Sequence, residues 1–390
     1  MLTSFFWVAL VGFITITFFY LVILFGQKNS SFKLFINLYF KQIRWLLFFF
    51  HLSTAFFLGG EVADVKLFAT AGYALAHKID IYWLDPQGGT YSFFPLMIFP
   101  YSLFWYISDR LPILTFSFLV KLLLIPVMFL TSRFFKSRIH RLLFLTNPVI
   151  FLTVTLHGQA DLALIFFFIL SIYYLEKPAK AGIFMAISIM IKTWSVMFLP
   201  LVFFKLKSFR FWISFGISFL IIGFLYKFFV FSSWQRILTA LIVHPSGSAG
   251  YWGITALLKL VWPSTVQFYS INRFWPLLAS LVFGWWIAWK KKLTIFPAAL
   301  LLILLTYVTT AGWGLQYSSW IIPFGILAQD FKKTNLYTLL SLPYLCIAYL
   351  GIAANAQVSP NNLVIFLSLP AWLFSIYWLT SFVKKQSRGN

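Results

Sequence analysis

Residues 2–25 read LTSFFWVALVGFITITFFYLVILF, a stretch without a charged side chain. A helix needs about 20 mainly apolar residues to cross a hydrocarbon core of about 30 Å. Apolar stretches of roughly 18–25 residues recur along the chain between charged residues or Gly and Pro. Because they lack the two-residue alternation of a membrane barrel, their backbones must bond within each segment as helices. The sequence predicts an all-α membrane protein, a polytopic bundle of about 11–13 transmembrane helices.

The composition supports this prediction. Of the 390 residues, 61% are hydrophobic and only 10% are charged, which leaves too little polar surface for a soluble protein of this size. The formal charge of +22 raises the question of nucleic acid as a partner. The basic residues form short clusters between apolar stretches and no single basic face, so we exclude nucleic acid and expect membrane lipids as partners.

The basic clusters predict the topology, because Lys and Arg of membrane proteins remain in the cytoplasm. One arrangement puts all of them inside, with residues 1–390 as one transmembrane domain, the N-terminus outside and two outer loops, 61–110 and 232–273. Its predicted spans include 2–25, one near 45–60, 211–231 and 363–382. The clusters are Lys28/Lys33/Lys41/Arg44, Arg133/Lys136/Arg138/Arg141, Lys177/Lys180, Lys205/Lys207/Arg210, Lys290/Lys291/Lys292, Lys332/Lys333 and Lys384/Lys385/Arg388. In this topology most acidic residues fall outside, namely Glu61, Asp64, Asp80, Asp85, Asp109 and Asp161, whereas Glu176 and Asp330 fall inside.

Residues 181–204 do not fit two full spans, although basic clusters flank both ends. Lys192 lies at their centre, where a charge is costly and usually lines a polar cavity or pairs with an anion. Two short half-helices that meet at Lys192 would explain both features. The alternative is one tilted helix from which the Lys192 side chain reaches the membrane surface.

The loop 61–110 is the predicted site of chemistry. We expect its segments 65–78 and 94–107 to be helices that lie in the membrane interface. The chain has no Gly-rich phosphate loop, no metalloprotease motif and no nucleophile elbow, and its single cysteine, Cys346, excludes a thiolate metal cluster. Substrates on the outer side of a membrane include lipid-linked ones. A carboxylate such as Asp64 would suit deprotonation of an acceptor hydroxyl, and Lys192 would stabilise a leaving phosphate.

Four groups of residues resemble the polyprenyl-phosphate-mannose-dependent mannosyltransferases of the GT-C glycosyltransferase superfamily. They are EVADVKLF at 61–68 with TYSFFPL at 90–96, the pair Asn147-Pro148 followed by HGQAD at 157–161, Ala181-Gly182 with Lys192 and Leu199-Pro200-Leu201, and GLQYSSWIIP at 314–323. The resemblance covers residues 61 to about 325 in the family's order. Asp64 matches the second acid of the family's D-x-D pair, whereas Val62 stands at the first, next to Glu61.

The resemblance implies a GT-C-like fold and an inverting hexosyltransferase, with mannose as the expected sugar. It implies a polyprenyl-phosphate donor, a glycolipid or glycan acceptor on the non-cytoplasmic face, and no cofactor or obligatory metal. Asp64 would be the catalytic residue. The compact loops favour a prokaryotic plasma membrane, with the active site facing outside.

Several other side chains are candidates for substrate binding, each with a structural alternative. Glu61 could assist Asp64 or only mark the end of a span. His157 and Asp161 are spaced for one helix face, as in a metal pair, but two ligands without a third are weak support, so we favour substrate hydrogen bonds. The full set of predicted binding residues is Glu61, His157, Gln159, Asp161, Lys192, His244, Gln316 and Tyr317.

Two alternatives stay open at this point. Asp64 could pair with Lys66 instead of acting as a base. Separately, His51 lies inside an apolar stretch, and we expect it to be a hydrogen-bonded core residue. A transporter or flippase of a lipid-linked or anionic solute would also have broken helices and a lysine within the membrane. The acceptor and the identity of the sugar are not encoded in any motif.

Overall fold

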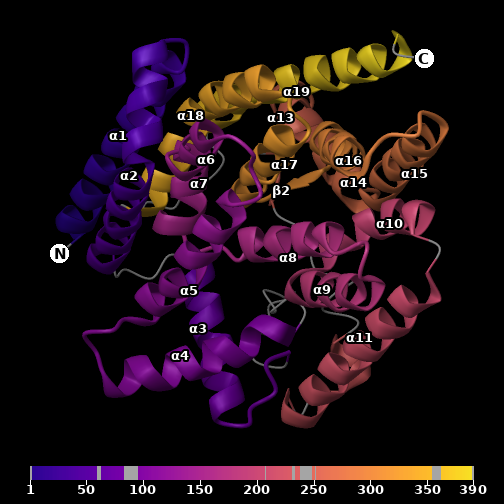
Figure 1. Cartoon of the computed structure of the whole chain (residues 1–390). Coiled ribbons are helices and arrows are strands. Elements are labelled where there is room, and N and C mark those ends of the chain that lie inside the picture. The colour runs from indigo at the N-terminus through magenta and orange to yellow at the C-terminus, as the bar shows by residue number, and fades with distance from the viewer. Residues whose placement is uncertain are drawn as a thin grey trace.

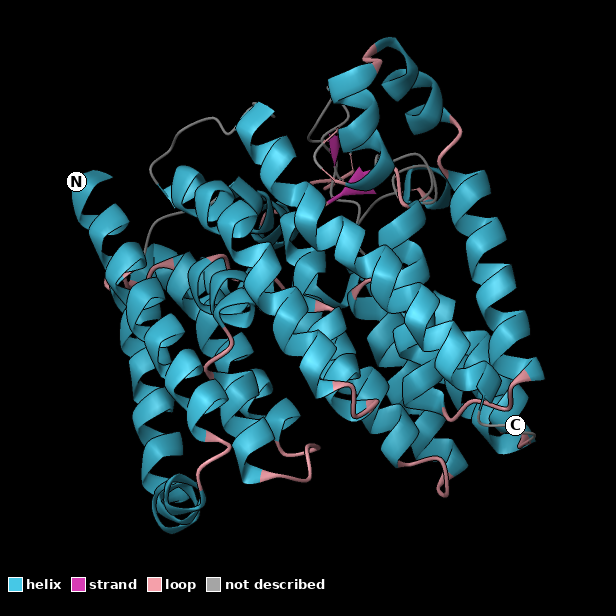
Figure 2. Ribbon diagram, turned by 90° about the horizontal axis from the view of Figure 1, so that it is seen from above, coloured by secondary structure: helices cyan, strands magenta, loops and turns pink. Residues whose placement is uncertain are grey.

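The structure, a computed structural model, describes residues 2–58, 63–82, 95–206, 208–230, 233–237, 248–250, 252–353 and 362–388. Within these ranges the chain is built almost entirely of helices, which confirms the predicted all-α class (Figure 1). Figure 2 shows most helices running between the upper and lower edges of the molecule, with many of the loops along the lower edge.

The helices of the N-terminal half are α1 (Leu2–Gly26), α2 (Ser30–Phe57), α3 (Ala63–Ala76), η1 (Pro95–Met97), α4 (Ile98–Arg110), α5 (Phe116–Ser132), α6 (Arg138–Leu145), α7 (Pro148–Ile150), η2 (Phe151–Leu156), α8 (Asp161–Tyr173), α9 (Pro178–Ile191), η3 (Thr193–Phe198) and α10 (Leu199–Lys205). The remaining elements are α11 (Phe209–Val230), β1 (Ser248–Ala249), α13 (Gly253–Val261), α14 (Ser264–Ile271), α15 (Phe274–Lys290), α16 (Ile295–Thr309), β2 (Gly312–Trp313), η4 (Leu315–Ser319), α17 (Ile321–Leu327), α18 (Phe331–Ala353) and α19 (Asn362–Arg388).

Three described helices are long and apolar enough to cross a membrane: Phe5–Gly26, Phe209–Phe229 and Asn362–Lys385. A fourth candidate is the pair Arg138–Leu145 and Pro148–Leu156, which is bent by 41°. Further apolar helices, such as Phe116–Ser132 and Ile295–Thr309, have 10–17 residues. By length and composition, the described residues thus contain three candidate spans, or four with the bent pair, and the predicted number of about 11–13 stays a prediction.

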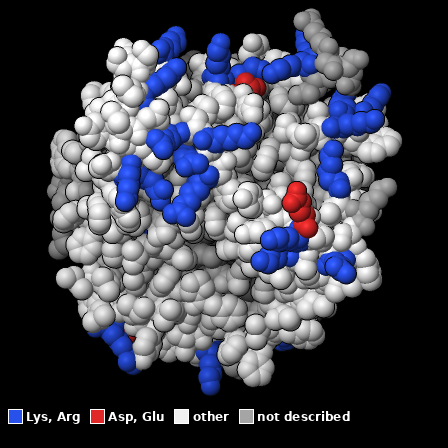
Figure 3. Space-filling view, viewed as in Figure 1, with Lys and Arg blue, Asp and Glu red and all other residues white. Residues whose placement is uncertain are grey.

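The helix α2 begins before the position that we predicted. The Asn29 side chain caps the helix by accepting a hydrogen bond from the backbone N–H of Phe32 at 3.1 Å. Consequently Lys33, Lys41 and Arg44 lie on the helix and not in a loop before a span at 45–60. Figure 3 shows one face of the molecule, on which Lys and Arg side chains far outnumber acidic ones.

The segment 232–273, predicted as an outer loop, contains regular structure in its described part. The strand β1 pairs antiparallel with β2, so that Ser248 lies opposite Trp313. The buried Trp252 ring stacks on Trp313 with 4.1 Å between ring centroids, and the Thr255 hydroxyl contacts the Ala311 carbonyl at 3.0 Å. Two helices, α13 and α14, follow this anchor.

The predicted interfacial helices 65–78 and 94–107 correspond to α3 and α4, which pack against each other (Figure 1). The two backbones approach closely at Gly72, where a Cβ atom would lie 2.4 Å from the Tyr101 carbonyl oxygen. Phe68 and Tyr101 stack beside this contact, with ring centroids 4.9 Å apart. Glycine at position 72 therefore allows α3, which carries Asp64, to lie against α4.

We expect Gly72→Ala to lower the free energy of unfolding by about 1–3 kcal/mol, because the added methyl group overpacks a backbone contact. The matched control is Gly216→Ala in α11, where an added Cβ meets nothing within 4 Å. Alanine favours a helix over glycine by about 1 kcal/mol, so the control should be neutral or stabilising. Denaturant unfolding in detergent would measure both, and an unchanged Gly72→Ala protein would contradict the close approach.

Candidate active site

The site is built around a break in the chain between α6 and α8. Asn147 caps α7 by accepting hydrogen bonds from the Val149 and Ile150 N–H groups at 3.0 and 3.3 Å. The following helix, η2, is of the π type and has His157 as its C-cap, and Gly158 adopts a left-handed φ of 77° that favours glycine. The end of η2 and the turn at Gly158 thus direct the chain so that Gln159 and Asp161 are buried in the interior.

The buried His51 side chain holds this break against α2. Its Nε2 lies 2.9 Å from the Leu145 carbonyl oxygen and its Nδ1 lies 2.6 Å from the Thr155 hydroxyl. Because a carbonyl only accepts, Nε2 carries the proton and Nδ1 accepts from Thr155. The prediction that His51 is a hydrogen-bonded core residue is confirmed.

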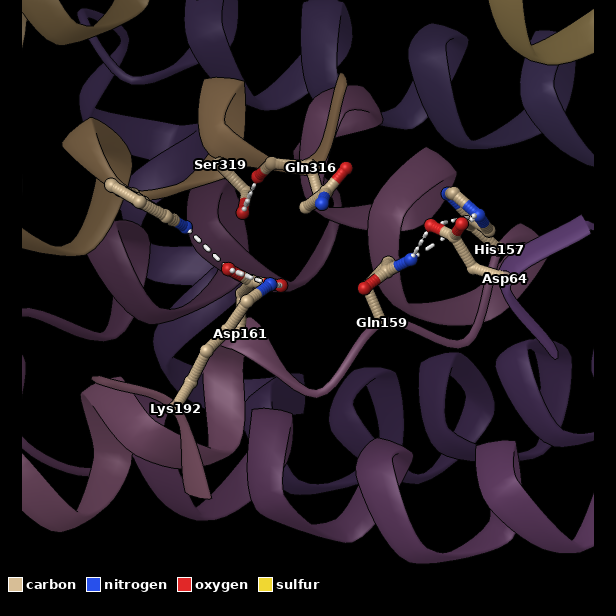
Figure 4. Close-up of polar contacts among 8 residues, drawn as sticks. Asp64, His157, Gln159, Asp161, Lys192, Gln316 and Ser319 are labelled. Carbon is tan, nitrogen blue, oxygen red and sulfur yellow. Dashed lines mark hydrogen bonds and ion pairs between the residues drawn. The ribbon is translucent and has the colours of Figure 1, made fainter. Parts of the chain in front are cut away.

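Asp64 lies in the first turn of α3 and meets the residues after η2 (Figure 4). Its Oδ2 lies 3.3 Å from His157 Nε2, and the Gln159 side-chain amide donates a hydrogen bond to the same oxygen. The Asp64 side chain is 41% exposed, whereas that of His157 is buried. The carboxylate is therefore held on one side and open on the other, and it pairs with His157 and not with Lys66.

The surroundings of Asp64 favour its ionised form. Burial by itself would raise the pKa of the carboxyl, but the hydrogen bond and charge of His157, the charge of Lys192 and the Gln159 amide together lower the pKa below its ordinary value. The carboxylate is thus ionised at neutral pH. Because the folded-state pKa is depressed, ionised Asp64 stabilises the fold above its unfolded pKa, and this contribution disappears as pH falls through the folded pKa.

We expect His157→Phe to raise the pKa of Asp64, because the variant removes a hydrogen-bond donor to the carboxylate. Infrared difference spectra of the carboxylate stretch across an acid titration would measure the shift. Asp64→Asn provides the control that assigns the band. A titration midpoint unchanged by His157→Phe would show that the imidazole does not act on the carboxyl.

Lys192 and Asp161 form a second, buried polar group. The Lys192 Nζ lies 3.1 and 2.9 Å from the two carboxylate oxygens of Asp161, and the Trp320 indole N–H donates to Asp161 Oδ1 at 2.8 Å. Asp161 is fully buried and Lys192 is 7% exposed. Satisfied donors and acceptors allow these charges to lie in the interior.

Lys192 lies at a break between two helices, with extended backbone angles of φ −157° and ψ 132°. The helix α9 ends at Ile191 and η3 begins at Thr193. The predicted interruption of residues 181–204 at Lys192 is confirmed, and a single tilted helix is excluded. The prediction that His157 and Asp161 share a helix face was wrong, because His157 is the C-cap of η2 and Asp161 begins α8.

No model of a known protein family matches this chain, and no curated protein matches it significantly.

An apolar groove of about 660 Å³ is lined by Thr193, which follows Lys192, and by Trp320, which donates to Asp161, whereas the two charged residues do not line it. Trp194 and Trp320, whose rings stack with centroids 3.5 Å apart, line the groove together with Tyr317. The Tyr317 ring centroid lies 5.6 Å from the Lys192 ammonium nitrogen. The remaining walls of the groove are mainly apolar side chains of η3, α10, α15 and α16, among them Met197, Pro200, Phe203, Leu278, Leu281 and Trp285.

The remaining candidates differ in how far the structure describes them. The backbone carbonyl of Gln316 accepts a hydrogen bond from Ser319 at 2.7 Å, whereas its amide side chain has no partner in the described part of the chain. Glu61 and His244 lie outside the described residues. Among the described residues, no group of three or more His, Cys, Asp or Glu side chains gathers as a metal site would require.

Trp194 and Trp320 were not among the predicted functional residues. Trp194 follows Lys192 by two positions, and Trp320 belongs to the segment GLQYSSWIIP at 314–323. Nothing in their spacing indicated that they would stack, because more than a hundred positions separate them along the chain. The sequence did indicate a buried partner for Lys192, because a charged side chain in an apolar stretch usually pairs with an opposite charge, here Asp161.

Proposed function

We propose that this protein is an inverting glycosyltransferase of the membrane, which transfers a hexose from a polyprenyl-phosphate donor to an acceptor hydroxyl on the non-cytoplasmic face. The observation that carries the proposal is the arrangement of Asp64. An ionised, partly exposed carboxylate is held by His157 and Gln159, close enough to Lys192 for that ammonium to lower its pKa. In a displacement at the anomeric carbon, a base can deprotonate the attacking hydroxyl and a nearby cation can stabilise the leaving phosphate.

In the proposed reaction, the acceptor oxygen attacks the anomeric carbon and forms the new glycosidic bond. Asp64 takes the proton from that hydroxyl. The bond between the anomeric carbon and the phosphate oxygen breaks, and the polyprenyl phosphate leaves with the electron pair. Lys192 stabilises the negative charge on the leaving phosphate, and attack from the opposite face inverts the anomeric configuration.

The contacts of Lys192 support this role and refine it. Asp161 holds the ammonium in place, and the Trp320 N–H bond fixes Asp161 in turn. A fixed cation costs no reorganisation when charge develops on the leaving group. Asp161 is therefore proposed as a residue that positions Lys192, and not as a direct contact of the sugar.

The groove beside Lys192 suits the lipid part of the donor. Its mainly apolar lining would bury isoprenoid units, while Trp194 and Tyr317 lie where the apolar part meets the polar group. The outward-facing side chains of α1 and α11 include exposed Phe18, Phe25, Phe224 and Phe228, an apolar surface that a lipid bilayer would cover. We accordingly propose a multi-pass location in a plasma membrane, with the site facing outside.

The proposal is tested by incubating the purified protein with a labelled polyprenyl-phosphate mannose and a panel of glycolipid acceptors. Labelled product, release of polyprenyl phosphate and an inverted anomeric configuration by NMR would be expected. A parallel assay in sealed vesicles would follow the labelled lipid across the bilayer without transfer. Movement without transfer would instead favour a transporter or flippase, a function that the broken helix at Lys192 would also suit.

A further inference from the structure

A group of arginines joins α2 to the turn between α5 and α6, remote from Asp64 along the chain. We call Arg44, Arg133, Arg138 and Arg141 the arginine patch. Arg141 donates to the Phe135 carbonyl at 2.7 Å and to the Arg133 carbonyl at 3.4 Å, while Arg138 donates to the Asn37 carbonyl at 2.8 Å. These bonds bring the turn and α2 together. Figure 3 shows a dense group of basic side chains over the region of α2 and α6, without an acidic side chain among them.

Among the described residues, no carboxylate forms an ion pair with the arginine patch. The positive charges of Arg133 and Arg141 act on Arg44 repulsively. The close contacts between basic side chains and carboxylates in the described residues involve His157, Lys192, Arg236 and Lys333 instead. Neither the Arg44 nor the Arg133 guanidinium has a hydrogen-bond partner within the described ranges. Like charges held together by backbone contacts favour a bound anion.

The side chains beside the arginine patch indicate what carries that anion. The helix α2 exposes Leu38, Trp45, Leu46 and Phe49, all large and apolar. Trp45 directly follows Arg44, and its ring stacks with that of Phe49 at a centroid distance of 6.0 Å. Tryptophan next to arginine is typical of the level at which lipid headgroups meet acyl chains. A soluble anion would use the guanidinium groups but gain nothing from this apolar face.

We propose that the arginine patch is a binding site for the phosphate of an anionic lipid headgroup. Arginine presents a planar fork of donors that matches phosphate oxygens in two-point contacts. Basic pockets between helices on the cytoplasmic side of membrane proteins bind anionic headgroups in this way. The site is separate from the proposed transfer reaction and uses none of its residues, so the two proposals succeed or fail independently.

The test compares retention of phosphatidylglycerol and phosphatidylcholine with identical acyl chains by native mass spectrometry of the purified full chain. The variant is Arg44→Gln with Arg133→Gln, two residues without described partners. Lys384→Gln with Lys385→Gln in α19 removes equal charge elsewhere and is the control. At about 1 kcal/mol for each cation near an anionic surface, the arginine variant should lose roughly tenfold or more in phosphatidylglycerol retention, and the control should change little.

Equal retention by all three proteins, or equal loss in both variants, would overturn the proposal, the latter because net charge alone would then explain the effect. Thermal unfolding in phosphatidylcholine would show whether the double variant folds. The exposed Arg133→Gln change alone serves as the second variant and should lower retention roughly fivefold. The last comparison measures retention of phosphatidylglycerol after inorganic phosphate is added at constant ionic strength. Displacement of the lipid by inorganic phosphate would assign the patch to a soluble anion and reject a lipid headgroup.

Discussion

Asp64→Asn is expected to lower sugar transfer by roughly 10²- to 10⁴-fold, the usual contribution of a general base. Asparagine keeps the shape of the side chain and can still accept the hydrogen bond from Gln159, but it cannot take a proton from the acceptor. The effect should therefore appear in the rate at saturating donor and acceptor, with the affinity for the donor largely retained. Initial rates with labelled donor and binding of unlabelled donor would separate the two quantities.

Asp109→Asn is the matched control for this experiment. Asp109 belongs to the same region, near the end of α4, and is exposed without an ion pair among the described residues. This variant should retain full activity. If Asp64→Asn transferred sugar at the rate of the wild type, Asp64 would not be the base, and the proposed reaction would lose its main support.

The second large effect concerns the buried pair of Lys192 and Asp161. Lys192→Met leaves the Asp161 carboxylate buried without its counter-charge, and loss of one partner of such a pair costs about 3–5 kcal/mol. We expect a corresponding fall in the free energy of unfolding, measured in detergent with denaturant. Lys333→Met is the control, because Lys333 lies 3.6 Å from Asp330 in a pair that is partly open to solvent. Such pairs contribute about 0–1 kcal/mol.

Combining Lys192→Met with Asp161→Asn distinguishes a structural role from a chemical one. The double variant contains no isolated buried charge, so much of the lost stability should return. Sugar transfer should stay low, because no cation remains to stabilise the leaving phosphate. If the double variant recovered both stability and transfer, Lys192 would serve only to neutralise Asp161, and the leaving group would need another partner.

Many helix positions followed from the sequence, because an apolar stretch and its flanking caps are local properties. Residues 2–25, 211–231 and 363–382 were predicted as spans, and the helices α1, α11 and α19 lie at these positions in the described residues. The break at Lys192 was also predictable, since one charge in a short apolar stretch is costly wherever the helix packs. The topology and the sidedness of the basic clusters stay predictions.

The helix ends were harder to predict. Asn29 starts α2 well before the apolar stretch, so three basic residues became helical. The π-type helix η2 and the turn at Gly158 separated His157 from Asp161, although their spacing suggested one face. Two residues four positions apart lie on one helix face only if the helix is continuous between them.

The sequence by itself determined that this chain forms apolar helices with a few isolated polar residues, and it pointed to Asp64, Lys192, His157, Gln159 and Asp161 by residue type and order. The tertiary structure alone decided how these residues pair. Gln159 and His157 hold Asp64, whereas Asp161 and Trp320 hold Lys192. The reason is physical: pairing joins residues that lie far apart along the chain, and helix packing, including the close contact at Gly72, sets those distances.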